Sequence, residues 1–123
     1  MSAAETNYAR LVSERMAWAQ EQRTALLAAI ASTRDARSLM FADDEHDPDG
    51  STASLDQARD TALLASTDRL LADLDGAQRR LVSGDYGRCE LCDGEIDAGR
   101  LVARPETTVC IGCAKRRGRS RPA

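Results

Sequence analysis

The chain has 123 residues, a formal net charge of −3 and only 3% aromatic residues. Its apolar residues are mostly Ala and Leu, which suits helices packed along a narrow seam and argues against a thick globular core. No segment approaches the ~18 consecutive apolar residues of a membrane span, and Met1 begins a polar stretch without the apolar region of a signal peptide. We therefore expect a cytoplasmic protein made of one domain or two small modules.

Charge is distributed unevenly along the chain. Positions 43–60 hold seven acidic residues against one arginine, Arg59. The segment from Lys115 to Arg121 holds five cationic residues and no acidic residue. The acidic overall balance disfavours a general nucleic-acid binder, whereas the basic end alone could contact phosphates.

The first half of the chain predicts one long helix. Residues 2–47 contain neither glycine nor proline. Apolar residues recur there mostly at three- and four-residue steps, the pattern of an amphipathic helix. These residues are Tyr8, Val12, Met16, Ala19, Leu26, Ile30 and Met40. We expect a helix over residues 5–41, about 55 Å long at ~1.5 Å per residue.

A turn and a second helix follow. Residues 47–51 combine proline, glycine and helix-capping residues, which indicates a turn. The second helix is expected over residues 52–82, where a short heptad seam consists of Leu63, Leu70, Leu74, Ala77 and Leu81. Two long helices joined by a short turn must lie antiparallel, because neither can bury its apolar stripe alone. Residues 1–83 therefore predict an antiparallel two-helix coiled-coil hairpin with an acidic tip at about residues 43–51.

The four cysteines come next, as two pairs with two-residue spacers. They are Cys89, Cys92, Cys110 and Cys113. Each spacer lets both thiolates of a pair reach one ion from a single tight turn, and this pattern is typical of a structural site for one Zn²⁺. Two disulfides or a dithiol redox pair are the alternatives, but the chain shows neither a secretion signal nor a βαβ scaffold. Four thiolates leave no open position on the metal, so we expect it to hold structure rather than to catalyse hydrolysis.

The boundaries of the cysteine module follow from this pattern. We expect a C4 zinc finger over residues 84–115 and a disordered basic tail over residues 116–123. Zinc with four thiolates carries a formal charge near minus two, so neighbouring cations are expected to offset it. The candidates are Arg88, Arg100 and Lys115.

We do not expect an enzyme. The single histidine, His46, lies in the acidic turn, and no nucleophile can be paired with it from the sequence. Its acidic neighbours should favour its charged form, so the charge of the tip would respond mildly to pH.

A longer pattern surrounds the cysteines. It reads Tyr86-Gly87-x-Cys89-x2-Cys92, Ile96, Arg100-Leu101-x-Ala103-Arg104-Pro105 and Cys110-x2-Cys113. This pattern resembles the zinc finger of the DksA/TraR family, and a preceding helical hairpin with Asp-Pro-Asp at its tip fits the same family over about residues 5–115. The resemblance implies a transcription regulator that binds bacterial RNA polymerase and inserts its coiled-coil tip into the secondary channel to modulate initiation. It implies no sequence-specific DNA binding.

The resemblance also implies a role for carboxylates at the tip. Asp47 and Asp49 are the candidates, with Asp44 as the alternate. The family tip reads Asp-x-x-Asp-x-Ala, whereas residues 47–51 here read Asp-Pro-Asp-Gly-Ser. A register over Asp44, Asp47 and Asp49 keeps the spacing but puts aspartate at the alanine position. Either register leaves the tip acidic.

The chain departs from the family pattern at three further positions, in the finger and on the helix before it. Asp93 stands where the family has a glycine directly after the second cysteine, so the turn is expected to differ locally. Asp73 and Ala114 stand where relatives that respond to the alarmone ppGpp have lysines, although Arg104 matches a basic residue of that set. Dependence on ppGpp is therefore not expected.

Two other functions remain open. The chain could be a nucleic-acid-binding zinc ribbon that uses its basic C-terminal tail, or a non-catalytic coiled-coil scaffold. The Ala-rich seam does not specify strong dimerisation, so we expect a monomer.

Overall fold

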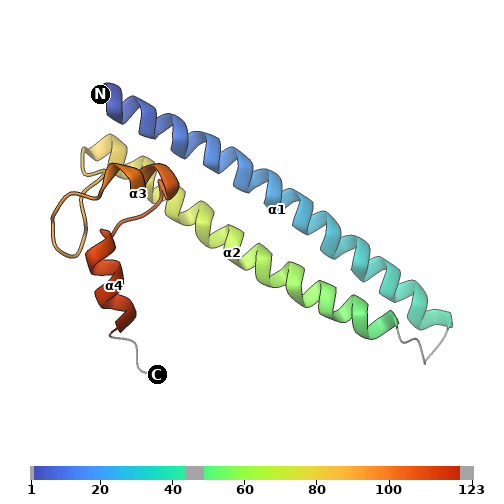
Figure 1. The fold of residues 1–123 in the computed structure, drawn as a ribbon. Coiled ribbons are helices and arrows are strands. Elements are labelled where there is room, and N and C mark those ends of the chain that lie inside the picture. Colours follow the sequence, from blue (N-terminus) through green and yellow to red (C-terminus); the bar gives the residue numbers. More distant parts are fainter. Residues whose placement is uncertain (1, 44–48, 120–123) are drawn as a thin grey trace. The chain divides into compact units, whose positions relative to one another are not determined.

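The computed structural model describes residues 2–43 and 49–119, which form four helices (Figure 1). They are α1 (Ala3–Asp43), α2 (Asp49–Ser83), α3 (Ala98–Ala103) and α4 (Ile111–Arg119). The described residues contain no strand, only an isolated antiparallel bridge between Arg88 and Glu95. The predicted mainly α fold class is confirmed. None of the described helices is both long and apolar enough to cross a membrane.

Both long helices extend beyond the bounds that the sequence predicted. α1 begins at Ala3 because Ser2 caps it: the Ser2 hydroxyl accepts the N–H of Glu5 at 3.2 Å. α2 begins at Asp49, so Asp49 and Gly50 belong to a helix and not to the expected turn. The tip candidates Asp44 and Asp47 lie outside the described residues.

The chain divides into two compact units, one formed by Met1–Ala17 with Leu71–Ala123 and the other by Trp18–Leu70. In the second unit, α1 and α2 run side by side in opposite directions (Figure 1). Arg23 Nε donates to Asp68 Oδ1 at 2.8 Å. Arg37 Nη1 donates to Gln57 Oε1, also at 2.8 Å. Of these two pairs, the one farther along α1 involves the earlier residue of α2. This order is the one that the predicted antiparallel arrangement requires.

The first unit combines the start of α1, the end of α2 and the cysteine module. Val12 of α1 and Leu74 and Ala77 of α2 are fully buried there, in agreement with this part of the predicted seam. Leu63, which the sequence also assigned to the seam, is 45% exposed, so the prediction was wrong at that position. α2 ends at Ser83, and Gly84 follows with a φ of +84°. The N–H of Asp85 then donates to the carbonyl of Arg80 at 2.9 Å. This is a Schellman-type helix end, for which glycine in the left-handed conformation is strongly preferred.

The C-terminal segment differs from the expectation at its start. The sequence predicted a disordered tail from residue 116, whereas α4 continues to Arg119. Lysine and arginine are good helix formers, and cations near a helix C-terminus are favoured by the dipole. Residues 120–123 lie outside the described residues.

Candidate zinc centre

The first cysteine pair lies on a tight backbone turn. The N–H of Cys89 donates to the carbonyl of Gly94 at 2.7 Å, and the N–H of Asp93 donates to the carbonyl of Cys89 at 2.9 Å. Asp93 has a φ of 62°, in the left-handed region. Aspartate tolerates this region better than most residues because its short side chain bonds locally. Asp93 therefore takes up the conformation for which a glycine was expected, and the turn forms without that glycine.

The second cysteine pair spans the start of α4. The N–H of Ala114 donates to the carbonyl of Cys110 at 2.9 Å, and the N–H of Cys113 lies 3.4 Å from Cys110 Sγ. Cys110 Sγ thus takes the part that a capping oxygen usually plays at a helix N-terminus. α4 thereby fixes the positions of both cysteines of this pair.

The two turns bring all four sulfur atoms together. The four Sγ atoms lie within 4.8 Å of one another, and Cys92 Sγ is 3.8 Å from Cys110 Sγ. Four thiolates at a Zn–S distance of about 2.3 Å in a tetrahedron are about 3.8 Å apart. A disulfide requires about 2.05 Å. The arrangement therefore fits one metal ion and not a pair of disulfides.

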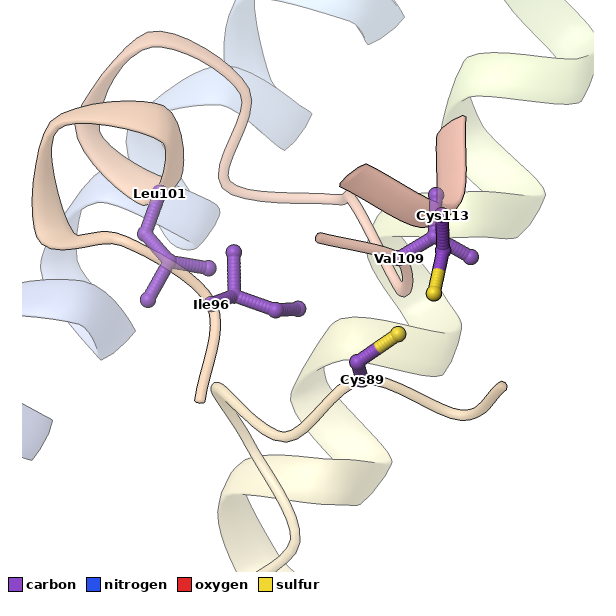
Figure 2. Close-up of a cluster of buried hydrophobic side chains, with 5 residues drawn as sticks. All are labelled: Cys89, Ile96, Leu101, Val109 and Cys113. Atoms are coloured by element: carbon purple, nitrogen blue, oxygen red, sulfur yellow. The ribbon is translucent and has the colours of Figure 1, made fainter. Parts of the chain in front are cut away.

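A small apolar core supports the sulfurs. It consists of Cys89, Ile96, Leu101, Val109 and Cys113 (Figure 2). Figure 2 shows the sulfur atoms of Cys89 and Cys113 directed toward each other. Leu101 comes from α3, whose N-cap Asp97 accepts the N–H of Gly99 at 3.2 Å. Both buried cysteines are therefore held by packing as well as by the backbone.

An aromatic pair packs against this core. The rings of Tyr8 on α1 and Tyr86 before the first cysteine pair have centroids 5.3 Å apart at 45°. The Tyr86 hydroxyl donates to the carbonyl of Pro105 at 2.8 Å. Burial raises the pKa of Tyr86 to about 12, and nearby Tyr8 acts in the same direction. The start of α1 is thereby tied to the finger within the first unit.

Backbone N–H groups favour the thiolate form of Cys89 and Cys110 by lowering the pKa of each. The pKa of Cys89 falls to about 6: the largest effect comes from the N–H of Cys110, and the N–H groups of Cys92 and Leu91 add to it. Hydrogen bonds to an anion stabilise the charged form. Because zinc binds thiolates rather than thiols, the chemistry of this donor set fits the metal.

One cation that contacts a cysteine sulfur was not among those expected from the sequence. Arg116 Nη2 lies 3.1 Å from Cys113 Sγ. Of the cations that were expected near the metal, Arg88 pairs with Asp93 at 3.8 Å and Arg100 Nε donates to the carbonyl of Val109 at 2.9 Å. The missed signal was helical spacing, since residues three apart on a helix are neighbours.

A hollow of about 520 Å³ lies beside the finger. Its lining includes Asp73, Arg100, Arg104, Thr107, Ala114 and Arg117. Asp73, Arg104 and Ala114, the three positions used above to predict that the protein does not depend on ppGpp, therefore all line this hollow. Arg104 Nε is also 3.9 Å from a carboxylate oxygen of Glu106.

Comparisons with known proteins agree with this geometry. Residues 84–117 match the family model of the prokaryotic dksA/traR C4-type zinc finger. Over 45 residues the chain is 36% identical to the RNA polymerase-binding transcription factor DksA of Haemophilus influenzae. Over 45 residues it is 42% identical to an uncharacterized protein of Aquifex aeolicus. Each match covers 37% of this chain and only 31% of the relative.

The fold extends the likeness beyond the finger. Transcription factor DksA2 from Pseudomonas aeruginosa matches with a TM-score of 0.71 at 24% identity, over 96% of this chain and 85% of that one. One structural zinc, predicted from the cysteine spacing, is confirmed by the finger match and the sulfur geometry. Residues 84–117 are therefore similar to the dksA/traR C4-type zinc finger, and the chain has the helical fold seen in DksA2.

Proposed function

We propose that this protein binds bacterial RNA polymerase and modulates transcription initiation. The observation that carries the proposal is the combination of the finger at residues 84–117 with the DksA2 fold over 96% of the chain. The Haemophilus influenzae relative is itself a polymerase-binding transcription factor. A closed four-thiolate site supports a structural role of the metal, and hence a regulator rather than an enzyme. Polymerase binding also implies the cytoplasm. We expect a monomer in which the hairpin gives way to the finger at about residue 83.

The finer proposal concerns the tip of the helical hairpin. We propose that it enters the secondary channel of the polymerase and brings Asp47 and Asp49, or Asp44 in the alternative register, near the catalytic magnesium. Carboxylates there would shift the balance between polymerase conformations through their charge. On this mechanism, affinity comes mainly from the helical flank and the finger, and activity comes from the tip.

A double substitution, Asp47→Asn with Asp49→Asn, tests the tip. Asparagine keeps the size and turn propensity of aspartate but removes both charges. We expect binding to purified core polymerase to change by less than about threefold, because the tip contributes little affinity, and the effect on promoter-complex lifetime to be largely lost. Pull-down and in vitro transcription measure the two properties separately.

The matched control is Asp35→Asn with Asp56→Asn. It removes the same charge from exposed positions of α1 and α2. The control should act like the parent protein in both assays. Equal potency of the tip variant and the parent would reject the tip mechanism. Loss of binding in both variants would show that the effect comes from net charge and not from the tip.

We further propose that the activity does not depend on ppGpp. Asp73 and the Arg104–Glu106 pair put two carboxylates at or beside the hollow that Ala114 also lines. Negative charge opposes the approach of a multiply phosphorylated nucleotide. Transcription measured with and without ppGpp checks this, and a response that disappears in Arg104→Ala would contradict it.

A nucleic-acid-binding role is the second candidate because α4 exposes consecutive cations at Lys115, Arg116 and Arg117. Such a row can contact phosphates. The variant Lys115→Ala with Arg117→Ala separates the candidates. Polymerase binding should persist, whereas binding to free DNA at physiological salt, if the second candidate holds, should fall with the lost charge.

A further inference from the structure

We propose that Arg116 is an outer-sphere cation of the zinc site that strengthens zinc retention by neutralising the Cys113 thiolate. The contact joins Arg116 Nη2 to Cys113 Sγ at 3.1 Å. For a sulfur acceptor this is a close approach, and a hydrogen bond from a charged donor to an anion is roughly twice as strong as one between neutral groups.

The positions of the two residues on α4 favour this contact. Cys113 and Arg116 are three residues apart on α4, so their side chains lie on the same face of the helix. Cys113 is buried in the core of the finger with 4% exposure, and the backbone at its N-terminal side is held by the N–H contact to Cys110 Sγ. A fixed acceptor on a fixed helix needs only the arginine side chain to be ordered. The entropic cost of the contact is therefore confined to ordering the arginine side chain.

Charge explains why the contact should matter for the metal. Four thiolates on Zn²⁺ leave a formal charge near minus two, and a guanidinium bonded to one sulfur brings the cluster nearer to neutrality. Backbone N–H groups donate to the sulfurs of Cys89 and Cys110, whereas a charged side chain, that of Arg116, donates to Cys113. Outer-sphere partners of metal ligands typically change metal affinity by 10- to 100-fold. Because Arg116 is exposed to solvent, we expect a change in zinc affinity at the lower end of this range.

Neighbouring cations supply a matched control. Lys115 and Arg117 flank Arg116 on the same helix and are also exposed, but Arg117 faces the hollow lined by Asp73. If the effect belongs to the bond with Cys113, it should follow position 116 alone. If it were a general effect of positive charge on α4, position 117 would matter equally.

The test uses the full zinc-loaded chain with Arg116→Met, Arg116→Lys and Arg117→Met. Methionine and lysine keep high helix propensity. Zinc affinity is measured by competition with a chromophoric chelator. We expect about a tenfold loss for Arg116→Met, a loss of less than about twofold for Arg117→Met, and recovery of at least half of the logarithmic loss in Arg116→Lys.

Cobalt substitution gives a readout that general folding would not move. In the Co²⁺-loaded chain, the thiolate-to-metal charge-transfer band should shift in Arg116→Met and not in Arg117→Met, because only the first change removes a hydrogen bond from a ligand sulfur. This band also reports on Arg116→Met if its zinc affinity is too low to measure. Equal affinities of the two methionine variants, an unshifted band, or no recovery with lysine would each overturn the proposal.

Discussion

Asp93 shows how one residue shapes the first metal turn. Its φ of 62° lies in a region that costs L-residues roughly 1–2 kcal/mol, although aspartate tolerates this region better than most residues. Its ion pair with Arg88, at 3.8 Å with both side chains largely exposed, contributes little in return. The turn therefore carries a small backbone cost that glycine would not have.

We predict that Asp93→Gly stabilises the finger by about 0.5–1 kcal/mol, the difference between the relieved strain and the greater chain entropy of unfolded glycine. Thermal unfolding of the zinc-loaded protein measures the change. Asp93→Asn removes the charge but tolerates the same φ, so it should lie close to the parent. A gain in Asp93→Asn as large as in Asp93→Gly would assign the effect to charge near the metal.

At the scale of elements, the Tyr8–Tyr86 pair joins α1 to the finger. The ring contact and the hydrogen bond from Tyr86 to Pro105 act on one side chain. Burial favours the neutral phenol, which raises the pKa of Tyr86 to about 12. Because the folded state holds this proton more tightly than the unfolded state, the stabilisation is complete below about pH 10 and is lost as the pH rises toward 12.

We predict that Tyr86→Phe lowers the free energy of unfolding by about 0.5–1.5 kcal/mol near neutral pH, the usual net value of one hydrogen bond. The deficit should shrink between about pH 10 and pH 12, because only the parent has Tyr86 to ionise. Denaturant unfolding at several pH values measures this difference. A deficit that stays constant through this range would contradict burial as the cause of the raised Tyr86 pKa. As a further check, absorbance titration of the Tyr8→Phe variant should detect Tyr86 ionising with a pKa of about 12.

At the scale of the whole molecule, the metal belongs to one of two compact units. The sulfurs and their core lie in Leu71–Ala123, whereas Trp18–Leu70 forms a helix pair with its own contacts. α1 and α2 hold 41 and 35 residues, against 6 and 9 in α3 and α4. Removal of the metal should therefore act mainly on the finger, because closed thiolate sites supply folding free energy to small modules.

We predict that Cys110→Ser abolishes tight zinc binding and unfolds the finger while most of the helical circular dichroism remains. Trp18, the only tryptophan, lies in the other unit and should keep its fluorescence. Ile111→Ser, at the exposed neighbouring position, should keep zinc. Simultaneous loss of the helical and Trp18 signals in Cys110→Ser would show that the units fold as one.

The sequence by itself determined the two long helices and the cysteine module, because both rest on local patterns. A stretch without glycine or proline and with three- and four-residue apolar steps can bury its stripe only as a helix. The two C-x2-C pairs can bring four sulfurs to one ion only if the chain between them folds back.

Tertiary structure decided the features that depend on neighbours in space. Asp93 adopts a conformation that its own type does not prefer, because the turn must close on the carbonyl of Cys89. The residue that meets a ligand sulfur is Arg116, since α4 continues beyond the expected end of the finger and brings it over Cys113. Tyr8 joins the finger core from almost eighty residues away in the sequence. No local pattern encodes such contacts, because they arise only when separate segments share the same core.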